Sequence, residues 1–178
     1  MKKLILLFAA ILIIFNCSNE GTGTLKVKLT DAPTDEFEDV TINIKEVNMI
    51  GQKQTTGKAI LSFADGEKKM NLLDLQNTST LLGEAEVTEG KYTQIRLVVY
   101  ETGNTARPVD GEDKPLTIAS GDVTGAKLVI SGGLEITADE EKEITLDWDL
   151  NTENSTQIKL NSDGSYHMTP VLKLQSVK

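Results

Sequence analysis

The sequence predicts an all-β domain, a β-sandwich of roughly eight to ten strands with one short helical segment. Two observations support this prediction. Apolar and polar residues alternate along several short segments, which is the period of a strand with one buried face. These segments are rich in β-branched and aromatic residues, and turns that combine Gly with Asp, Asn or Ser separate them.

Two segments near the start of the expected domain, TLKVKLT and DVTINIKEV, show the alternation. Their apolar residues are expected to face the core, namely Leu25, Val27 and Leu29 in the first and Val40, Ile42 and Ile44 in the second. Val47 falls out of step with the second set, which predicts a β-bulge or the end of a strand.

The segment MNLLDLQNTSTLLGE is the expected helical exception. Its leucines have the spacing of short helical turns that end at Gly83, namely Leu72, Leu73 and Leu75, then Leu81 and Leu82.

The second half of the chain contains three expected turns, at 109–115, 131–133 and 161–165. The segments YTQIRLVVY, GAKLVI and EITLDWDL are expected strands. In the last, the inward residues are Ile144, Leu146, Trp148 and Leu150, and the outward residues are Thr145, Asp147 and Asp149. The polar stretch 103–114 is expected to be a loop suited to partner contacts, and Pro170 places the final run at a sheet edge or a bulge.

The N-terminus has the features of a bacterial lipoprotein signal peptide, expected to span residues 1–16. Lys2 and Lys3 precede an unbroken apolar run at 4–15, which is too short to span a bilayer comfortably. Cys17, the only cysteine, follows this run. In lipoproteins a cysteine at this position carries diacylglycerol on its sulfur and an N-acyl chain such as palmitate.

The residues around the cut are similar to a lipobox at Ile14 and Cys17, whereas small residues are more usual than Phe15 and Asn16. An uncleaved N-terminal anchor with an incidental cysteine is the alternative. We favour a lipidated tether at 17–23 and one domain at 24–178. The expected location is the outer membrane or cell surface rather than the inner membrane.

The net charge of the chain and its lack of catalytic motifs argue against several classes of function. Removing residues 1–16 leaves 162 of the 178 residues and shifts the formal net charge from −9 to −11. So acidic a chain argues against nucleic acid as a partner, since nucleic acid binds basic patches. The sequence holds one histidine, His167, expected at a surface or half-buried strand position, and none of the common catalytic motifs. We therefore expect no enzyme and no catalytic residue.

Several segments carry a resemblance to a known family, in order from about residue 24 to residue 174. The most specific are LTDAP and EGKYTQIRL, supported by GAKLVI, ITLDWDL and GSYHMTPVLKL. Together they resemble the bacterial family called domain of unknown function 4382. The resemblance implies an exported, often lipid-anchored sandwich with immunoglobulin-like or transthyretin-like architecture, and it implies no activity.

The acidic segment DAPTDEFED is the candidate metal site. Calcium prefers six to eight oxygen ligands, and the carboxylates that could supply them are Asp31, Asp35, Glu36 and Asp39. The spacing differs from that of an EF-hand. The alternative, which we favour, is a turn in which Asp31 bonds its own backbone before Ala32 and Pro33 while Phe37 enters the core.

These observations predict a membrane-anchored lipoprotein that acts as a non-catalytic interaction or adhesion module at the cell envelope. Its partners are the membrane, through the lipid, and an unidentified protein or glycan. The alternatives are a calcium- or carbohydrate-binding domain and a purely structural envelope protein. No cofactor is expected beyond the covalent lipid. Aromatic residues make up only 4% of the chain, and Trp148 is expected in the core, which weakens the carbohydrate alternative.

Overall fold

The computed structural model describes residues 20–31, 34–52, 56–152 and 155–178. This part of the chain folds into strands with a single 3-10 helix, η1 (Leu72–Leu75). The strands are β1 (Thr22–Asp31), β2 (Phe37–Gly51), β3 (Lys58–Ser62), β4 (Lys69–Asn71), β5 (Thr80–Thr88), β6 (Gly90–Val99), β7 (Thr105–Pro108), β8 (Lys114–Ile118), β9 (Ala126–Ile136), β10 (Glu141–Asp149), β11 (Asn151–Thr152), β12 (Ser155–Thr156), β13 (Ile158–Leu160), β14 (Tyr166–Met168) and β15 (Val171–Val177).

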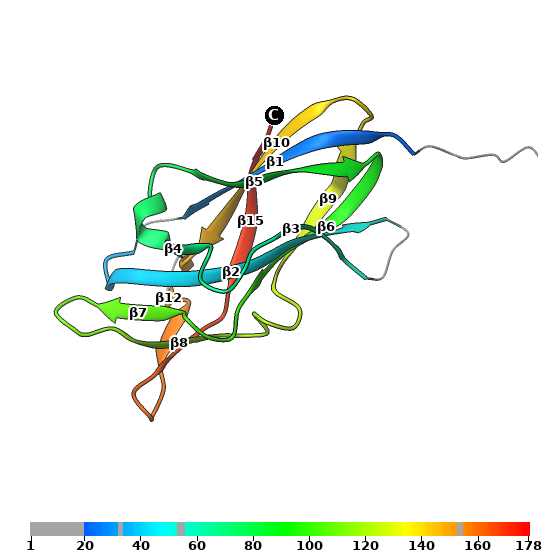
Figure 1. Cartoon of the computed structure of the whole chain (residues 1–178). Helices are drawn as coiled ribbons and strands as arrows, with labels where there is room; N and C mark the ends of the chain where they lie inside the picture. Colours follow the sequence, from blue (N-terminus) through cyan, green and yellow to red (C-terminus); the bar gives the residue numbers. More distant parts are fainter. Residues whose placement is uncertain (1–19, 32–33, 53–55, 153–154) are drawn as a thin grey trace, which may run out of the picture.

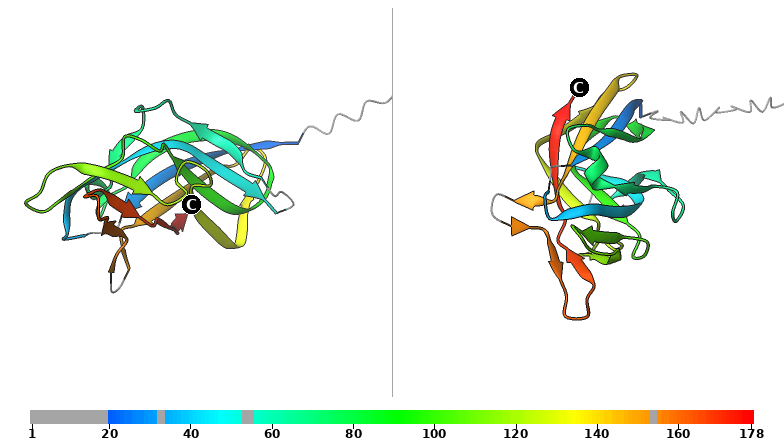
Figure 2. Two further views of the ribbon diagram at one scale, coloured as in Figure 1. Left: turned by 90° about the horizontal axis from the view of Figure 1, so that it is seen from below. Right: turned by 90° about the vertical axis from the view of Figure 1, so that its left-hand side faces the viewer.

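The all-β prediction is confirmed, and the strands other than β11 and β12, which among the described residues pair only with each other, form a sandwich-like pair of mixed sheets (Figure 1). One sheet has the order β15-β10-β1-β5. The other follows the path β13-β14-β8-β7-β2-β6-β9, with β3 and β4 paired to β2. The pairs β1–β10 and β14–β8 are parallel. The hairpin of β13 and β14 projects from one end of the molecule (Figure 2).

The apolar residues of the predicted alternating segments form the core. Leu25, Val27 and Leu29 of β1 are fully buried, and β2 contributes three equally buried residues, Val40, Ile42 and Ile44. Strand β10 adds three of the residues that were expected to face inward, Ile144, Leu146 and Trp148, and the fourth, Leu150, directly follows the strand; each has 0% exposure. These side chains form one continuous hydrophobic cluster between the sheets, so burial of one face of each strand determines the register.

The irregularity predicted at Val47 is confirmed as a bulge region of β2. The pairing of β2 shifts between Ile44 and Glu46 against β6, and between Val47 and Asn48 against β3. The shift moves the side chain of Val47 back to the buried face, where it is fully covered.

The turn predicted at 131–133 is wrong, because these residues lie inside β9. Gly132 and Gly133 have positive φ, as a turn would require. The pairing of β9 with β6 is nevertheless interrupted here. Leu134 lies opposite Tyr92, and the next paired residue of β9, Val129, lies opposite Gln94. The glycines therefore make a large bulge, and β9 resumes its pairing beyond it.

The helical prediction is half right. Leu72–Leu75 form η1, where the Asn71 side chain accepts a hydrogen bond from the Leu73 amide. Leu81 and Gly83 are instead part of β5, because this segment pairs with β1. Strand pairing overrides the weak helical spacing of the leucines.

The expected loop at 103–114 is also wrong in part, since it contains β7 and its connection to β8. The two strands pair, with Thr105 opposite Pro115 and Ala106 opposite Lys114. The turns at 109–115 and 161–165 do connect adjacent strands, and Pro170 lies between β14 and β15, where the chain passes from one sheet to the other.

Candidate functional site

The lipidation candidate Cys17 lies outside the described residues. The description begins at Glu20, and β1 starts at Thr22, two residues ahead of the expected domain start. Over the described ranges, no helix is both long and apolar enough to cross a bilayer.

The four acids of the candidate metal site are spread over different environments. Asp31 ends β1 with 4% exposure, whereas Asp35 and Glu36 are exposed on a bend. Asp39 lies on β2, where its carboxylate accepts a 2.8 Å hydrogen bond from the Thr41 hydroxyl. In the described part of the chain, no three His, Cys, Asp or Glu side chains gather as a metal would require.

The alternative interpretation of this acidic segment is confirmed at Phe37 only. The Phe37 ring is 7% exposed and meets Tyr166 edge-on, with ring centres 5.4 Å apart. Ala32 and Pro33, where the turn was expected, lie outside the described residues.

A polar pocket of about 530 Å³ lies beside the C-terminal half of β1 and β10. Because these strands are parallel, Thr30 lies opposite Asp147, and Asp31 follows at the same end. The other lining residues are Asn77, Thr78 and Ser79, after η1, and Gln175 of β15. The sequence drew attention to both aspartates, but nothing in it indicated the amides and hydroxyls beside them.

Thr30 links the pocket to the segment that follows η1. Its hydroxyl donates to the Leu75 carbonyl oxygen at 3.1 Å and also contacts the Thr78 carbonyl oxygen. These contacts hold residues 77–79 over the sheet, and Asn77 adopts a left-handed φ of 58°. Asparagine tolerates this conformation better than most residues. The residue type at position 77 therefore helps to form this wall of the pocket.

The outward positions of Asp147 and Asp149 on β10 predicted that both carboxylates lie in solvent. In the structure they do not. Asp149 is only 3% exposed and forms an ion pair with Lys173 of the neighbouring strand β15. Thr145 is 5% exposed. The prediction of solvated outward residues is therefore wrong at Thr145 and Asp149, because β10 is an interior strand with β1 and β15 on either side.

The pocket has an unusual carboxylate in Asp147. Burial raises the pKa of Asp147, the nearby Asp149 carboxylate raises it further, and Lys173 opposes both effects. One Asp147 oxygen is buried and has no hydrogen-bond partner among the described residues. The carboxylates, amides and hydroxyls of the pocket can exchange hydrogen bonds with a polar ligand.

We expect Asp147→Asn to stabilise the fold at pH 7, by about 0.5 kcal/mol. A carboxyl whose pKa is raised by folding penalises the folded state above that pKa, and the penalty fades as pH falls towards 3.8. The gain should therefore shrink in melting curves taken at decreasing pH.

Asp163→Asn is the matched control of opposite sign. Hydrogen bonds from the Ser165 hydroxyl and amide lower the pKa of Asp163. This variant should lose stability at pH 7 and approach the parent protein as pH falls below 3.8. Destabilisation by Asp147→Asn at neutral pH would contradict our account of the pocket.

The fold and this site define a sandwich-like all-β domain with a polar pocket on one sheet. Within that class, the chain belongs to the family described as Domain of unknown function (DUF4382), which matches residues 22–170. The family resemblance seen in the sequence is thus confirmed. No curated protein and no solved structure matches the chain.

Proposed function

We propose that this chain is a lipid-anchored protein of the bacterial cell envelope and works there as a non-catalytic interaction module. One observation supports the proposed lipid anchor: the only cysteine, Cys17, closely follows the apolar run at 4–15. A single acyl chain holds a protein only marginally at a membrane, whereas the two or three chains of a lipoprotein hold it stably.

The position of the domain supports this proposal. Only four residues separate Cys17 from the start of β1 at Thr22. An extended tether of that length reaches at most about 18 Å. A lipid on Cys17 would therefore keep the sandwich close to the membrane, with the start of β1 nearest the bilayer.

The proposal of a binding role is supported by the kind of surface that the domain presents. The sequence lacks the common catalytic motifs and has one histidine, which is half-buried on β14. Two hollows among the described residues, the polar pocket and a second one between β3 and β5, offer hydrogen-bonding, charged and apolar groups to a partner. We place the protein at the outer membrane or cell surface, with a protein or glycan partner.

Cys17→Ser tests the anchor. We expect the serine variant to remain an unprocessed precursor and to take up no alkyne-palmitate in growing cells, because the thioether cannot form. The matched control, Ser18→Ala, should be labelled and should sediment with membranes. A Cys17→Ser protein that is cleaved normally and released in soluble form would show that ordinary signal peptidase processes the chain.

A further inference from the structure

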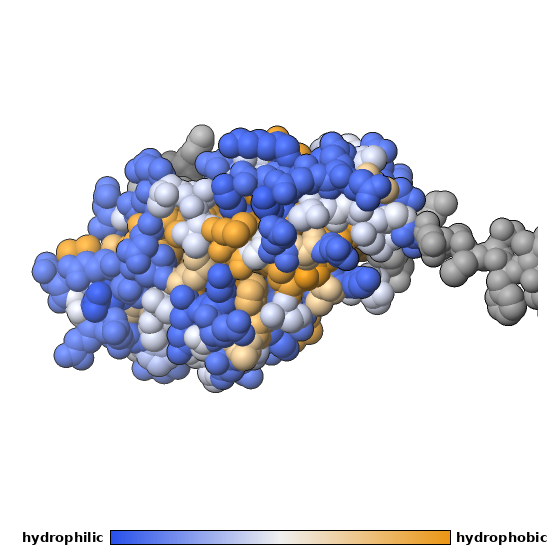
Figure 3. Space-filling model, turned by 45° about the horizontal axis from the view of Figure 1, so that its top comes forward, coloured by the Kyte–Doolittle hydropathy of each residue, from blue (hydrophilic) through white to orange (hydrophobic). Residues whose placement is uncertain are grey.

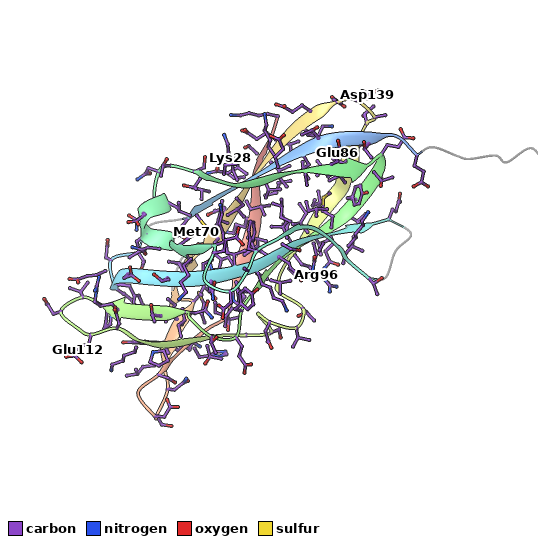
Figure 4. The ribbon with its side chains drawn as sticks, in the orientation of Figure 1. Lys28, Met70, Glu86, Arg96, Glu112 and Asp139 are labelled. Carbon is purple, nitrogen blue, oxygen red and sulfur yellow. The ribbon has the colours of Figure 1, made fainter. Side chains whose placement is uncertain are left out.

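One side of the sandwich is left open, because within the described residues no hydrogen-bonded strand joins the two sheets there. The open seam, as we call it, lies between β3 and β4 of one sheet and β5 of the other. Among the partly buried apolar side chains that pack against the core, Leu61 lies in this seam against Gly83 of β5, and Ile60 and Tyr92 line a hollow beside it. Figure 3 shows hydrophobic surface bordered by hydrophilic residues on this side of the molecule. Met70 and Glu86 lie on its two sides (Figure 4).

Both strands that border the open seam have an unused backbone edge. Within the described residues β3 pairs only with β2, and β5 pairs only with β1. The Leu81 carbonyl of β5 is reached across the seam by the Lys68 ammonium at 3.4 Å. A side chain from the turn between β3 and β4 therefore bonds a β5 backbone group that a neighbouring strand would otherwise use.

Strands β3 and β5 approach closely at Leu61 and Gly83 and leave a hollow beside this contact. Leu61 of β3 lies against Gly83 of β5 so closely that a Cβ on Gly83 would be 2.8 Å from a Leu61 methyl carbon. Next to this contact is a hollow of about 500 Å³, lined by the first half of β3, the second half of β5 and the start of β6. Ligand pockets have volumes of roughly 300–1,000 Å³, so the space suits a few residues of extended peptide.

The hollow combines an apolar base with charges of both signs at its rim. Met49 and Val87 are buried in its base, and Ile60 lines its wall. Glu86 on β5 and Lys58 on β3 are exposed at opposite edges, and neither forms an ion pair with another described residue. A segment placed between the edges would meet an acidic group on one side and a basic group on the other.

We propose that the open seam binds an extended segment of a partner protein, which adds to the β5 or β3 edge as a strand. Unpaired strand edges are templates for pairing, and this mode of binding takes its affinity from backbone hydrogen bonds and its specificity from alternate side chains. Apolar residues of the segment would face the partly buried Ile60 and its neighbour in the hollow, Val87. Its charged residues would lie beside Glu86 and Lys58. This inference rests on the proposed role as an interaction module and not on the lipid anchor.

The charges favour such a segment over the membrane surface as the occupant. Binding to an anionic bilayer needs a cluster of basic residues. The hollow instead has Lys58 and Lys91 against Glu20, Glu86 and Glu89, in a chain of net charge −9. Mixed charges on two facing edges match a strand that carries charges of both signs.

The test is selection of displayed random decapeptides on the full-length mature protein in detergent micelles. Enriched peptides are synthesised, and their affinity is measured by fluorescence anisotropy. We expect apolar and charged residues to alternate in these peptides. Ile60→Lys should weaken binding at least about tenfold, whereas Val129→Lys, at a 65% exposed position of β9 that does not line the hollow, should change it less than about twofold.

A backbone control separates strand addition from simple apolar contact. Methylation of alternate peptide nitrogens removes the donors of one edge and should also cost at least about tenfold in affinity. The proposal is overturned if no peptide is enriched, if Ile60→Lys binds the peptides equally well, or if methylation has no effect. A dimer in light scattering that Ile60→Lys dissociates, without peptide binding, would assign the seam to a second copy instead. Absence of peptide binding by the unsubstituted protein, with intact labelling at Cys17, would refute the seam proposal and leave the anchor standing.

Discussion

Replacing Trp148 by alanine lowers the free energy of unfolding by about 3–5 kcal/mol, which is the usual cost of truncating a fully buried aromatic residue. Trp148 has 0% exposure and lies on the inner face of β10, beside Leu172 of β15 and opposite the end of β1. The neighbouring strands cannot close over a cavity of this size without breaking their pairing. A domain of this length should melt about 6–20 °C lower.

The measurement is a melting curve by far-ultraviolet circular dichroism, since alanine removes the only tryptophan. Trp148→Phe is the matched control. It retains most of the ring and removes an indole N–H that has no hydrogen-bond partner among the described residues. The phenylalanine variant should therefore lose much less stability than the alanine variant.

Fluorescence of the unmodified protein gives an independent check. A buried indole emits at shorter wavelength than an exposed one, and the emission should shift to longer wavelength on unfolding. Emission typical of exposed tryptophan in the native protein, or a cost below about 1 kcal/mol for alanine, would contradict this account of the core. Such a result would also return an exposed aromatic to consideration as a glycan contact.

The strands that place Trp148 could be predicted because alternation is a local property. Burial of one face of β10 requires an apolar residue at every second position, and Ile144, Leu146 and Trp148 satisfy that requirement. The burial of Asp149 could not be predicted in this way. It depends on Lys173, which lies 24 residues away and reaches it only because β15 pairs with β10.

The polar pocket and the open seam escaped the sequence analysis for the same reason. Asp31 and Asp147 reach one pocket through the parallel pairing of β1 and β10, and no local pattern encodes that pairing. The open seam is a missing pairing between β3 and β5, and a sequence pattern does not show which strands remain unpaired. The four acids of the first loop were grouped by closeness in sequence, and the fold separates them.

Glycines with positive φ occur both in a bulge and in a turn of this fold, so the same local signal leads to different structures. Gly132 and Gly133 suggested a turn, and their positive φ agrees with one, but they lie in a bulge of β9. Gly125, at the start of the expected strand GAKLVI, also has a positive φ, of 71°. Its amide donates a 2.8 Å hydrogen bond to the Ser120 carbonyl, which closes the turn ahead of β9.

Gly125→Ala should destabilise the protein by about 2–4 kcal/mol, the second large effect that the structure predicts. A Cβ at this position would lie 2.7 Å from the Leu97 carbonyl oxygen and 2.9 Å from the Leu97 carbonyl carbon. These are backbone atoms of β6, which is paired on both sides by β2 and β9, so they cannot rotate away. The strained φ adds roughly 1–2 kcal/mol to the cost of this collision.

Gly132→Ala separates the two contributions. Gly132 has a φ of 80°, close to that of Gly125, but a Cβ there would have no neighbour within 4 Å. This variant should therefore show the conformational cost alone, about 1–2 kcal/mol. Chemical unfolding of both variants gives the difference, which measures the clash with Leu97. Equal losses at the two positions would mean that β6 moves freely away from the added methyl group, and the close approach of Gly125 to β6 would then play no part in stability.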